Sequence, residues 1–508
     1  MVGVPKSNRC DFCKWRKTKC DENWPTCGSC KKAGRVCSGP VRLTKFVHNG
    51  KHTRECQNMG DLDQDATDAS PDTSNSGETA RLYNVKNRTT TSGATFSKMK
   101  LRPSKPKVLI KPSATRAELL AGRIATCLTS SEGTGYSLSM FLSTLGYVPP
   151  LVDSNKALFD ATDLLLSTWL KLCQGNRPPD IFDLRSYNRA LRSLQKVLND
   201  PQEQTSSATL AATIYLQATE YWFDYGNGIN QISHSNGIHS IMMKRGPPKP
   251  GDNFGTQLIL DSYAFMYMLV QKGKIDNFFD QPGWRKAITS FFTQFKTRTP
   301  ILVEISKLLH QGSMVADTIT RFRKIHKIPR HSQDPRVLKE LAITLDTLSK
   351  SFHDLDQRTI KPLLENGMIH EVEDTESPFG TSYEFLSPVL ALHFANVAAF
   401  NIRIRRLKQR LNSILEVEDP SLELGCLEYS ARIWKTCRYS KTMRPLCAAS
   451  FNSPISTSYI AAEPAGRAYL LATLREADMY RKGSNSRWTE SVILSENYVL
   501  TQDDGRIS

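Results

Sequence analysis

Apolar residues recur at intervals of three and four positions through most of the chain beyond residue 115. This spacing gathers them on one face of an α-helix. The clearest examples are Arg116–Thr129, Leu158–Cys173, Ser206–Tyr221, Leu338–Phe352 and Glu384–Leu415. Strand-like alternation and hairpin signals are scarce. The pattern predicts a mostly all-α chain whose largest part is an all-α helical domain over residues 113–508.

Apolar residues become sparse before this domain. Five aspartates fall between Asp61 and Asp72, and Ser, Thr, Asn and Gly dominate from there to Ser97. Such a composition buries too little apolar surface to fold. We therefore predict a disordered, flexible linker over residues 41–112, preceded by a small domain at residues 1–40. Within the linker, the basic run Lys98–Lys107 is equally typical of a nuclear-import signal and of an ordinary charged spacer.

The charge of the chain favours polyanionic partners. The formal net charge is +17, and residues 1–50 contain eleven Lys and Arg against three Asp and Glu. Nucleic acid is the first candidate and an anionic membrane the second. The apolar stretches Leu258–Val270 and Leu386–Phe400 are too short to span a bilayer, and the first ten residues lack a signal-peptide core. We expect an intracellular protein with no membrane partner, in which cysteines are free thiols or metal ligands.

Six of the twelve cysteines fall within residues 10–37 in a duplicated pattern. Each half is a CxxC pair with a third cysteine seven residues on, and a shift of 17 positions superposes Cys10, Cys13 and Cys20 on Cys27, Cys30 and Cys37. A CxxC pair lets two sulfurs on a tight turn reach one tetrahedral metal, and the six residues that follow suit a short helix. Two tetrahedral zinc ions need eight ligand positions, which six cysteines fill only if two of them bridge both metals.

Other metal-binding designs fit this pattern less well. A single zinc ribbon would leave Cys20 and Cys37 unused at symmetric offsets. A metallothionein-like store would need further cysteines in the flanks, which are basic instead. A zinc knot that makes no DNA contact stays open as an alternative. The symmetry favours a cluster of two zinc ions.

The segment Arg9–Cys37, RCDFCKWRKTKCDENWPTCGSCKKAGRVC, resembles the fungal binuclear zinc-cluster DNA-binding domain. The six cysteine spacings, the basic run after the second cysteine and Pro25 between the halves carry the resemblance. It implies that Cys10 and Cys27 bridge the two zinc ions, while Cys13 with Cys20 and Cys30 with Cys37 complete the two sites. It also implies a nuclear, sequence-specific regulator of transcription by RNA polymerase II that binds double-stranded DNA.

Four cations lie between the second and third cysteines: Lys14, Arg16, Lys17 and Lys19. In the family, the end of the first helix enters the major groove over a CGG-type triplet. The resemblance implies that Lys17 reads a base, with Arg16 beside it, because Lys and Arg commonly bind the O6 and N7 atoms of guanine. The others are expected at phosphates, together with Lys31, Lys32 and Arg35. Trp15 is expected to pack on the module.

The segment Ser38–Met59 contains no sustained apolar heptad, so the coiled-coil dimer usual in the family is not predicted here. A homodimer and transcription cofactors stay candidate partners. The segment Leu210–Gly246, with His234, Gly237 and Arg245, is similar to the fungal-specific transcription-factor regulatory domain. His234 is interpreted as a satisfied core or capping group rather than a ligand. A helical domain of this kind commonly encloses a small-molecule effector.

The remaining features favour a regulator over an enzyme. There is no GxSxG, HExxH or P-loop motif in the sequence. The five cations of Arg403–Arg410 are interpreted as a solvated helix face, in preference to a second import signal or a DNA contact. A redox sensor is a weaker alternative to buried small hydrophobes for Cys426, Cys437 and Cys447.

Overall fold

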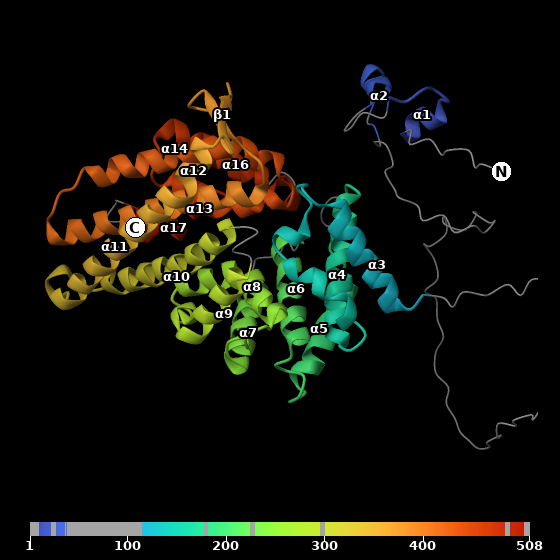
Figure 1. Cartoon of the computed structure of the whole chain (residues 1–508), viewed down its shortest axis with the longest axis horizontal. Coiled ribbons are helices and arrows are strands. Elements are labelled where there is room, and N and C mark those ends of the chain that lie inside the picture. Colours follow the sequence, from blue (N-terminus) through green and yellow to red (C-terminus); the bar gives the residue numbers. More distant parts are fainter. Residues whose placement is uncertain are drawn as a thin grey trace, which may run out of the picture. The chain divides into compact units, whose positions relative to one another are not determined.

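The computed structural model of the chain describes residues 10–21, 27–35, 37, 114–176, 181–223, 229–294, 300–482 and 488–501. The chain divides into two compact units, one within residues 1–106 and the other within residues 107–508 (Figure 1). The predicted linker, the segment Ser38–Met59, the run Lys98–Lys107 and Pro25 lie outside the described residues.

The first unit contains two short helices, α1 (Asp11–Trp15) and α2 (Gly28–Lys32). Each helix begins directly after the first cysteine of a CxxC pair. Among the described residues of this unit, the buried ones are cysteines, with Phe12 half-buried beside them. A unit with so few apolar side chains depends on its sulfur cluster for a core.

The first half of the second unit is built from helices that run from cyan to green in Figure 1. They are α3 (Arg116–Ser130), α4 (Lys156–Cys173), α5 (Leu184–Leu198), α6 (Ser207–Phe223), α7 (Ile229–Arg245), α8 (Asn253–Gln271) and α9 (Pro282–Thr293). Helix α3 begins with a capping box, in which Thr115 and Glu118 satisfy each other's backbone N–H groups. Helices α4 and α6 lie at the centre, and α6 is buried on nearly all sides.

The second half runs from yellow to red in Figure 1. Its helices are α10 (Pro300–His326), α11 (Pro335–Leu355), α12 (Lys361–Glu365), α13 (Pro388–Leu415), α14 (Ser421–Thr442), α15 (Asn452–Tyr459), α16 (Pro464–Lys482) and α17 (Glu490–Glu496). Helix α13 is the axis of this half, since it packs against α10, α11, α14 and α15. No helix in the described part of the chain is long and apolar enough to cross a membrane.

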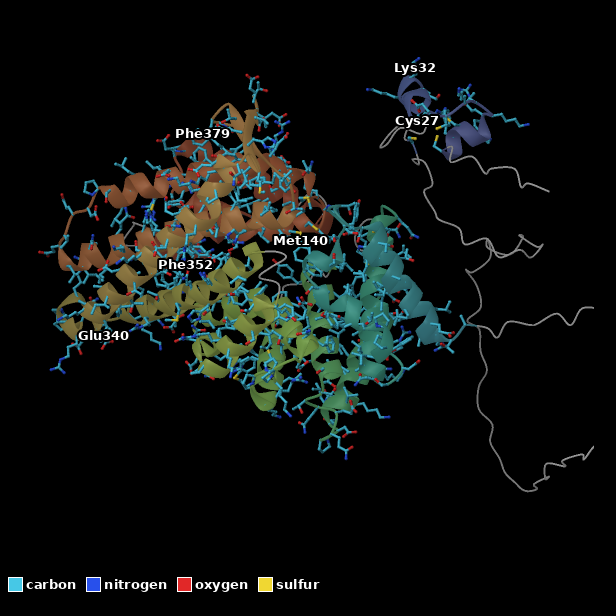
Figure 2. The ribbon with its side chains drawn as sticks, in the orientation of Figure 1. Cys27, Lys32, Met140, Glu340, Phe352 and Phe379 are labelled. Atoms are coloured by element: carbon cyan, nitrogen blue, oxygen red, sulfur yellow. The ribbon has the colours of Figure 1, made fainter. Side chains whose placement is uncertain are left out.

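The predicted all-α character is confirmed, and the five predicted helices are present as α3, α4, α6, α11 and α13. The start of the last one was wrong. Glu384 lies in strand β2 (Thr381–Phe385), which pairs antiparallel with β1 (Ile369–Glu373), and α13 begins four residues later at Pro388. Ser387 caps α13 and Pro388 occupies its first position. These residues mark the start of the helix, which apolar spacing alone does not reveal. Phe379 lies in the loop of this hairpin (Figure 2).

The basic run Arg403–Arg410 is not a solvated face, and that interpretation was wrong. Arg403 and Arg406 are each 4% exposed. Arg403 donates to hydroxyl groups on α15 and α8, and Arg406 forms an ion pair with Glu423 at 2.6 Å. Partners from three other helices replace water around these guanidinium groups, which is the condition for burying a charge. Counting cations along one helix could not reveal partners so distant in sequence.

The two halves of the helical unit also contact each other through residues that are distant in the sequence. The backbone N–H groups of Leu446 and Cys447 donate to the Gly135 carbonyl oxygen at 2.9 and 3.1 Å. The Leu446 side chain is buried in the core of the first half. The Cys447 thiol also donates to the backbone carbonyl oxygen of Ser137, 310 positions earlier in the chain. At Gly135 an added Cβ would lie 1.9 Å from the Arg444 carbonyl oxygen, so only glycine permits this approach.

A second tight contact predicts a large loss of stability. Gly466, in the first turn of α16, lies against the buried ring of Trp434, and an added Cβ would come within 1.9 Å of it. We expect Gly466→Ala to lower the free energy of unfolding by about 3 kcal/mol, because neither helix can yield without opening the core. Denaturant titration of the full chain measures this. Gly237→Ala on α7 is the control and should be neutral or slightly stabilising, because an added Cβ there would meet no atom within 4 Å outside the neighbouring backbone of its own helix. Equal midpoints for the two variants would contradict the prediction.

The buried imidazole of His393 on α13 makes stability depend on pH. Its Nε2 lies 3.1 Å from the Thr359 hydroxyl on the π-helical turn η6 (Asp356–Ile360). Burial lowers the pKa of His393 from 6.5 to about 4. Between these values the unfolded chain binds a proton that the folded chain does not, so the free energy of unfolding falls by about 3 kcal/mol as the pH drops from 6.5 to 4. Exchange of His393 for glutamine should flatten this dependence in denaturant titrations, whereas the same exchange at exposed His331 should leave it unchanged.

Candidate metal centre and nucleic-acid surface

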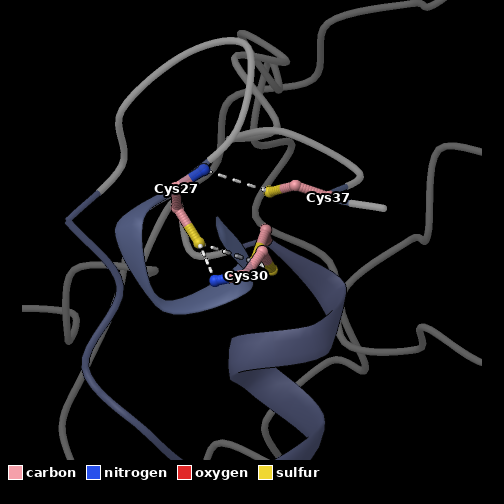
Figure 3. Close-up of side chains that lie close together, drawn as sticks. Cys27, Cys30 and Cys37 are labelled. Atoms are coloured by element: carbon pink, nitrogen blue, oxygen red, sulfur yellow. Dashed lines mark hydrogen bonds between the residues drawn. The ribbon is translucent and has the colours of Figure 1, made fainter. Parts of the chain in front are cut away.

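The CxxC turns bring their sulfurs together at the starts of the two helices. Cys27 caps α2, and its Sγ accepts from the Cys30 backbone N–H at 3.4 Å. The Cys27 N–H in turn donates to the Cys37 Sγ at 3.5 Å, so the third cysteine of this half returns to the same turn (Figure 3). The helix predicted between the second and third cysteines of each half was misplaced. It begins directly after the first cysteine of the pair and ends two residues after the second, at Trp15 and at Lys32.

The six sulfurs form two overlapping sets of four. One set contains Cys10, Cys13, Cys20 and Cys27, and the other contains Cys10, Cys27, Cys30 and Cys37, with the ligand atoms of each set within 4.8 Å of one another. The Sγ atoms of Cys10 and Cys27 lie 3.7 Å apart. The Cys10–Cys30 and Cys13–Cys27 separations are also 3.7 Å. Thiolates bound to one tetrahedral zinc at about 2.3 Å must lie about 3.8 Å apart, so the donor set fits zinc.

The environment of these sulfurs favours a cation. Five of the six cysteines are buried, and Cys37 is half-buried. Desolvation raises the pKa of the Cys13 and Cys30 thiols. Thiols in such surroundings become thiolates near neutral pH only beside a positive charge such as a metal ion.

The sequence duplication is also a duplication of backbone structure. In the first half, the backbone N–H groups of Arg16 and Thr18 donate to the carbonyl oxygens of Phe12 and Cys13. The same two hydrogen bonds recur 17 positions later, from Ala33 and Arg35 to Ser29 and Cys30. Both helices therefore end in a Schellman turn with one left-handed residue. That residue is Gly34 in the second half, with φ 60°, and Lys17 in the first half, with φ 54°. A lysine occupies the position that glycine adopts at lower cost.

The predicted DNA-binding side chains lie around this turn. Arg16, Lys17 and Lys19 are exposed. Lys14 lies on α1, and its side chain is outside the described residues. The second-half cations Lys31, Lys32 and Arg35 are exposed as well. The structure thus presents cations from both halves to solvent.

The expected packing of Trp15 was wrong, because the residue is 76% exposed. Phe12 takes that place: it packs on the cysteine cluster, and the Arg16 and Arg35 guanidinium groups lie 5.7 and 5.5 Å from its ring centre. Trp15 lies in the last turn of α1, three residues beyond Phe12. The two ring centres are 6.3 Å apart, and the composition alone did not indicate which of the two aromatic residues packs on the sulfurs.

Asp21 is a structural residue that the sequence patterns did not single out. Its carboxylate accepts from the Gly28 backbone N–H at 2.9 and 3.0 Å, at the start of α2. An acidic group at a helix N-terminus is stabilising. The contact ties the end of the first half to the start of the second.

In the helical unit, the candidate residue His234 lies on α7 with its Nε2 2.8 Å from the Glu220 carboxylate, which is buried on α6. The Tyr187 hydroxyl of α5 donates to the same carboxylate. The interpretation of His234 as a satisfied group is confirmed. Cys426, Cys437 and Cys447 are buried free thiols, as expected for small hydrophobes.

Comparison with known proteins matches a family at the N-terminal segment. Residues 9–45 match the family described as the fungal Zn(2)-Cys(6) binuclear cluster domain. An uncharacterized transcriptional regulatory protein of Saccharomyces cerevisiae is 38% identical over 61 residues, which cover 11% of this chain and 7% of that protein. The chain thus matches a small fraction of that relative's length. No solved structure matches the chain.

Proposed function

We propose that this chain, which carries a fungal Zn(2)-Cys(6) binuclear cluster domain at residues 9–45, is a sequence-specific regulator of transcription by RNA polymerase II. It binds double-stranded DNA through the first unit and reads CGG-like triplets in the major groove. Its working compartment is the nucleus. It acts by binding rather than by catalysis.

One observation carries this proposal: two four-sulfur sets share Cys10 and Cys27, and the helix that leaves this core ends in exposed cations. A zinc knot with a purely structural role has no need of Arg16, Lys17 and Lys19 on one short segment. A phosphate-binding surface needs such a segment, because neutralising phosphates supplies most of the binding free energy.

Two zinc ions would be held in these sets, with Cys10 and Cys27 as the shared ligands. Bound zinc supplies the free energy that folds a module with almost no apolar core. The protein contributes the spacing of the thiolates and the N–H donor of Cys30, which orients the Cys27 sulfur.

The left-handed residue Lys17 lies just beyond the end of α1. The cations that follow the second cysteine therefore lie close to one helix end. Lys17 is the proposed base-reading residue, with Arg16 beside it. Lys14, Lys19 and the second-half cations Lys31, Lys32 and Arg35 would bind phosphates and fix the register without reading sequence.

Metal stoichiometry and selection from a randomised duplex pool, measured on one preparation of the full chain, test the proposal together. Two zinc ions per chain with enrichment of CGG-containing duplexes would support it and would give the half-site spacing. One zinc ion and no enrichment would leave only a structural knot and would move the search for function to the helical unit.

The helical unit is the proposed regulatory domain. It is a candidate site for a small-molecule effector, for transcription cofactors and for a second copy of the chain. A passive tether is the competing role. A fusion of residues 113–508 to an unrelated DNA-binding domain separates the two, because an activating or repressing unit changes the output of a reporter gene and a tether does not.

A further inference from the structure

A cavity of about 330 Å³ opens between three helices of the second unit. Most of its lining residues belong to α3 and α4, and α5 contributes Arg189. Its apolar wall comes from α3 and α4. The residues of that wall are Leu119, Leu120 and Phe159. A volume of this size is at the lower end of the range for small-molecule sites.

Charged side chains surround the apolar wall, and cations outnumber anions. Two carboxylates, Asp160 and Asp163, lie among the cations Arg116, Arg123, Lys156 and Arg189. Each carboxylate is held by two cations: Asp160 lies 3.4 Å from both Lys156 and Arg189, and Asp163 lies 2.5 and 3.1 Å from Arg123 and Arg189. These ion pairs fix the guanidinium groups in place and leave a net positive charge.

Arg116 is the cation that these carboxylates do not neutralise. It is exposed at the first position of α3, and within the described residues no ion pair or hydrogen bond engages its side chain. An unneutralised guanidinium beside a cavity is a ready partner for a carboxylate or phosphate group.

Helix direction adds to the positive potential. Arg116 and Lys156 begin α3 and α4, and Arg123 meets Asp163 two turns further along each helix. The two helices therefore run in the same direction, with both N-terminal ends at the same end of the cavity. Helix N-termini carry partial positive charge. At α3 the Glu118 carboxylate of the capping box offsets part of it, whereas α4 is capped by the neutral Asn155 side chain, so the start of α4 contributes more to the potential.

We propose that this cavity binds a small organic carboxylate with a hydrocarbon body. The carboxylate group pairs with Arg116 and Lys156 at the helix starts, and the hydrocarbon body lies against Leu119 and Phe159. The proposal rests on the proposed regulatory role of the helical unit only for its biological consequence, since binding itself is measured directly.

The test is calorimetric titration of the full, zinc-loaded chain with octanoate, butyrate and inorganic phosphate. We expect saturable binding of one octanoate per chain. Butyrate should bind at least 10-fold more weakly, since each buried methylene contributes about 0.8 kcal/mol. Phosphate should bind more weakly than octanoate because it makes no use of the apolar wall. Phosphate binding equal to that of octanoate would overturn the proposal.

Variants locate the site. Exchange of Arg116 for glutamine should weaken octanoate binding about 10-fold, and Leu119→Glu, which places a negative charge on an exposed position of the wall, should abolish it. Arg192 is the matched control: it is exposed on α5 and does not line the cavity, so Arg192→Gln should leave binding unchanged. No saturable binding by the unaltered chain, or an equal effect of both arginine exchanges, would refute the site.

Zinc content and duplex selection on the same preparation keep this test separate from that of the proposed function. A preparation with two zinc ions and a selected duplex but no octanoate binding would refute the cavity proposal alone.

Discussion

Exchange of Cys10 for serine is expected to remove both zinc ions from the chain, whereas exchange of Cys13 should remove only one. Cys10 belongs to both four-sulfur sets, and Cys13 belongs to one. Loss of a shared ligand leaves each metal with three thiolates and removes the link between the halves. Because structural zinc contributes on the order of 10 kcal/mol to the folding of so small a module, the Cys10 variant should also lose DNA binding completely.

Metal analysis of the purified full chain measures this difference. Exchange of Cys173, an exposed cysteine on α4, is the control and should leave the zinc content at the level of the unaltered chain. A Cys10 variant that keeps one tightly held zinc ion would contradict the shared-ligand arrangement and would favour two independent sites.

Exchange of Lys17 for alanine should reduce the preference for CGG-containing duplexes by about 10- to 100-fold, the value of one good base contact. Zinc content should stay unchanged, because Lys17 lies outside both sulfur sets. Competition binding with matched and mismatched duplexes gives the preference, and metal analysis confirms the integrity of the cluster.

Two further exchanges make the Lys17 test decisive. Lys17→Gly removes the side chain and should therefore lose sequence preference. It should also make the module more stable, because the left-handed conformation at this position costs a residue with a side chain about 1 kcal/mol more than it costs glycine. Lys32→Ala removes an exposed cation of the second half and should weaken binding to all duplexes alike. An unchanged preference in Lys17→Gly would exclude this residue from base reading.

The sequence predicted those features that depend on local spacing. The cysteine register indicated two overlapping metal sites because ligand positions in a duplicated CxxC pattern can be counted, and three-and-four spacing located the long helices. The left-handed conformation of Lys17 was also within reach, since the 17-residue shift aligns it with Gly34. That alignment is informative only once a helix end is known to lie there.

Features that depend on distant partners were missed. The burial of Arg403 and Arg406 rests on hydroxyl and carboxylate groups of α8, α14 and α15, and no local pattern indicates such partners. The β-hairpin was missed because its strands are five residues each and their buried and exposed positions do not alternate regularly. The cavity between α3, α4 and α5 likewise exists only once three helices have packed.

The hydrogen bonds from Leu446 and Cys447 to Gly135 limit how the helical unit can be divided for experiments. Because a side chain from residue 446 completes the core of the first half, a fragment that ends before it would expose that core, and a fragment that begins after residue 300 would leave Leu446 without its apolar surroundings. A deletion series through this unit would therefore report global unfolding rather than the loss of an activating or repressing segment. Point substitutions on its surface are the informative way to map its output.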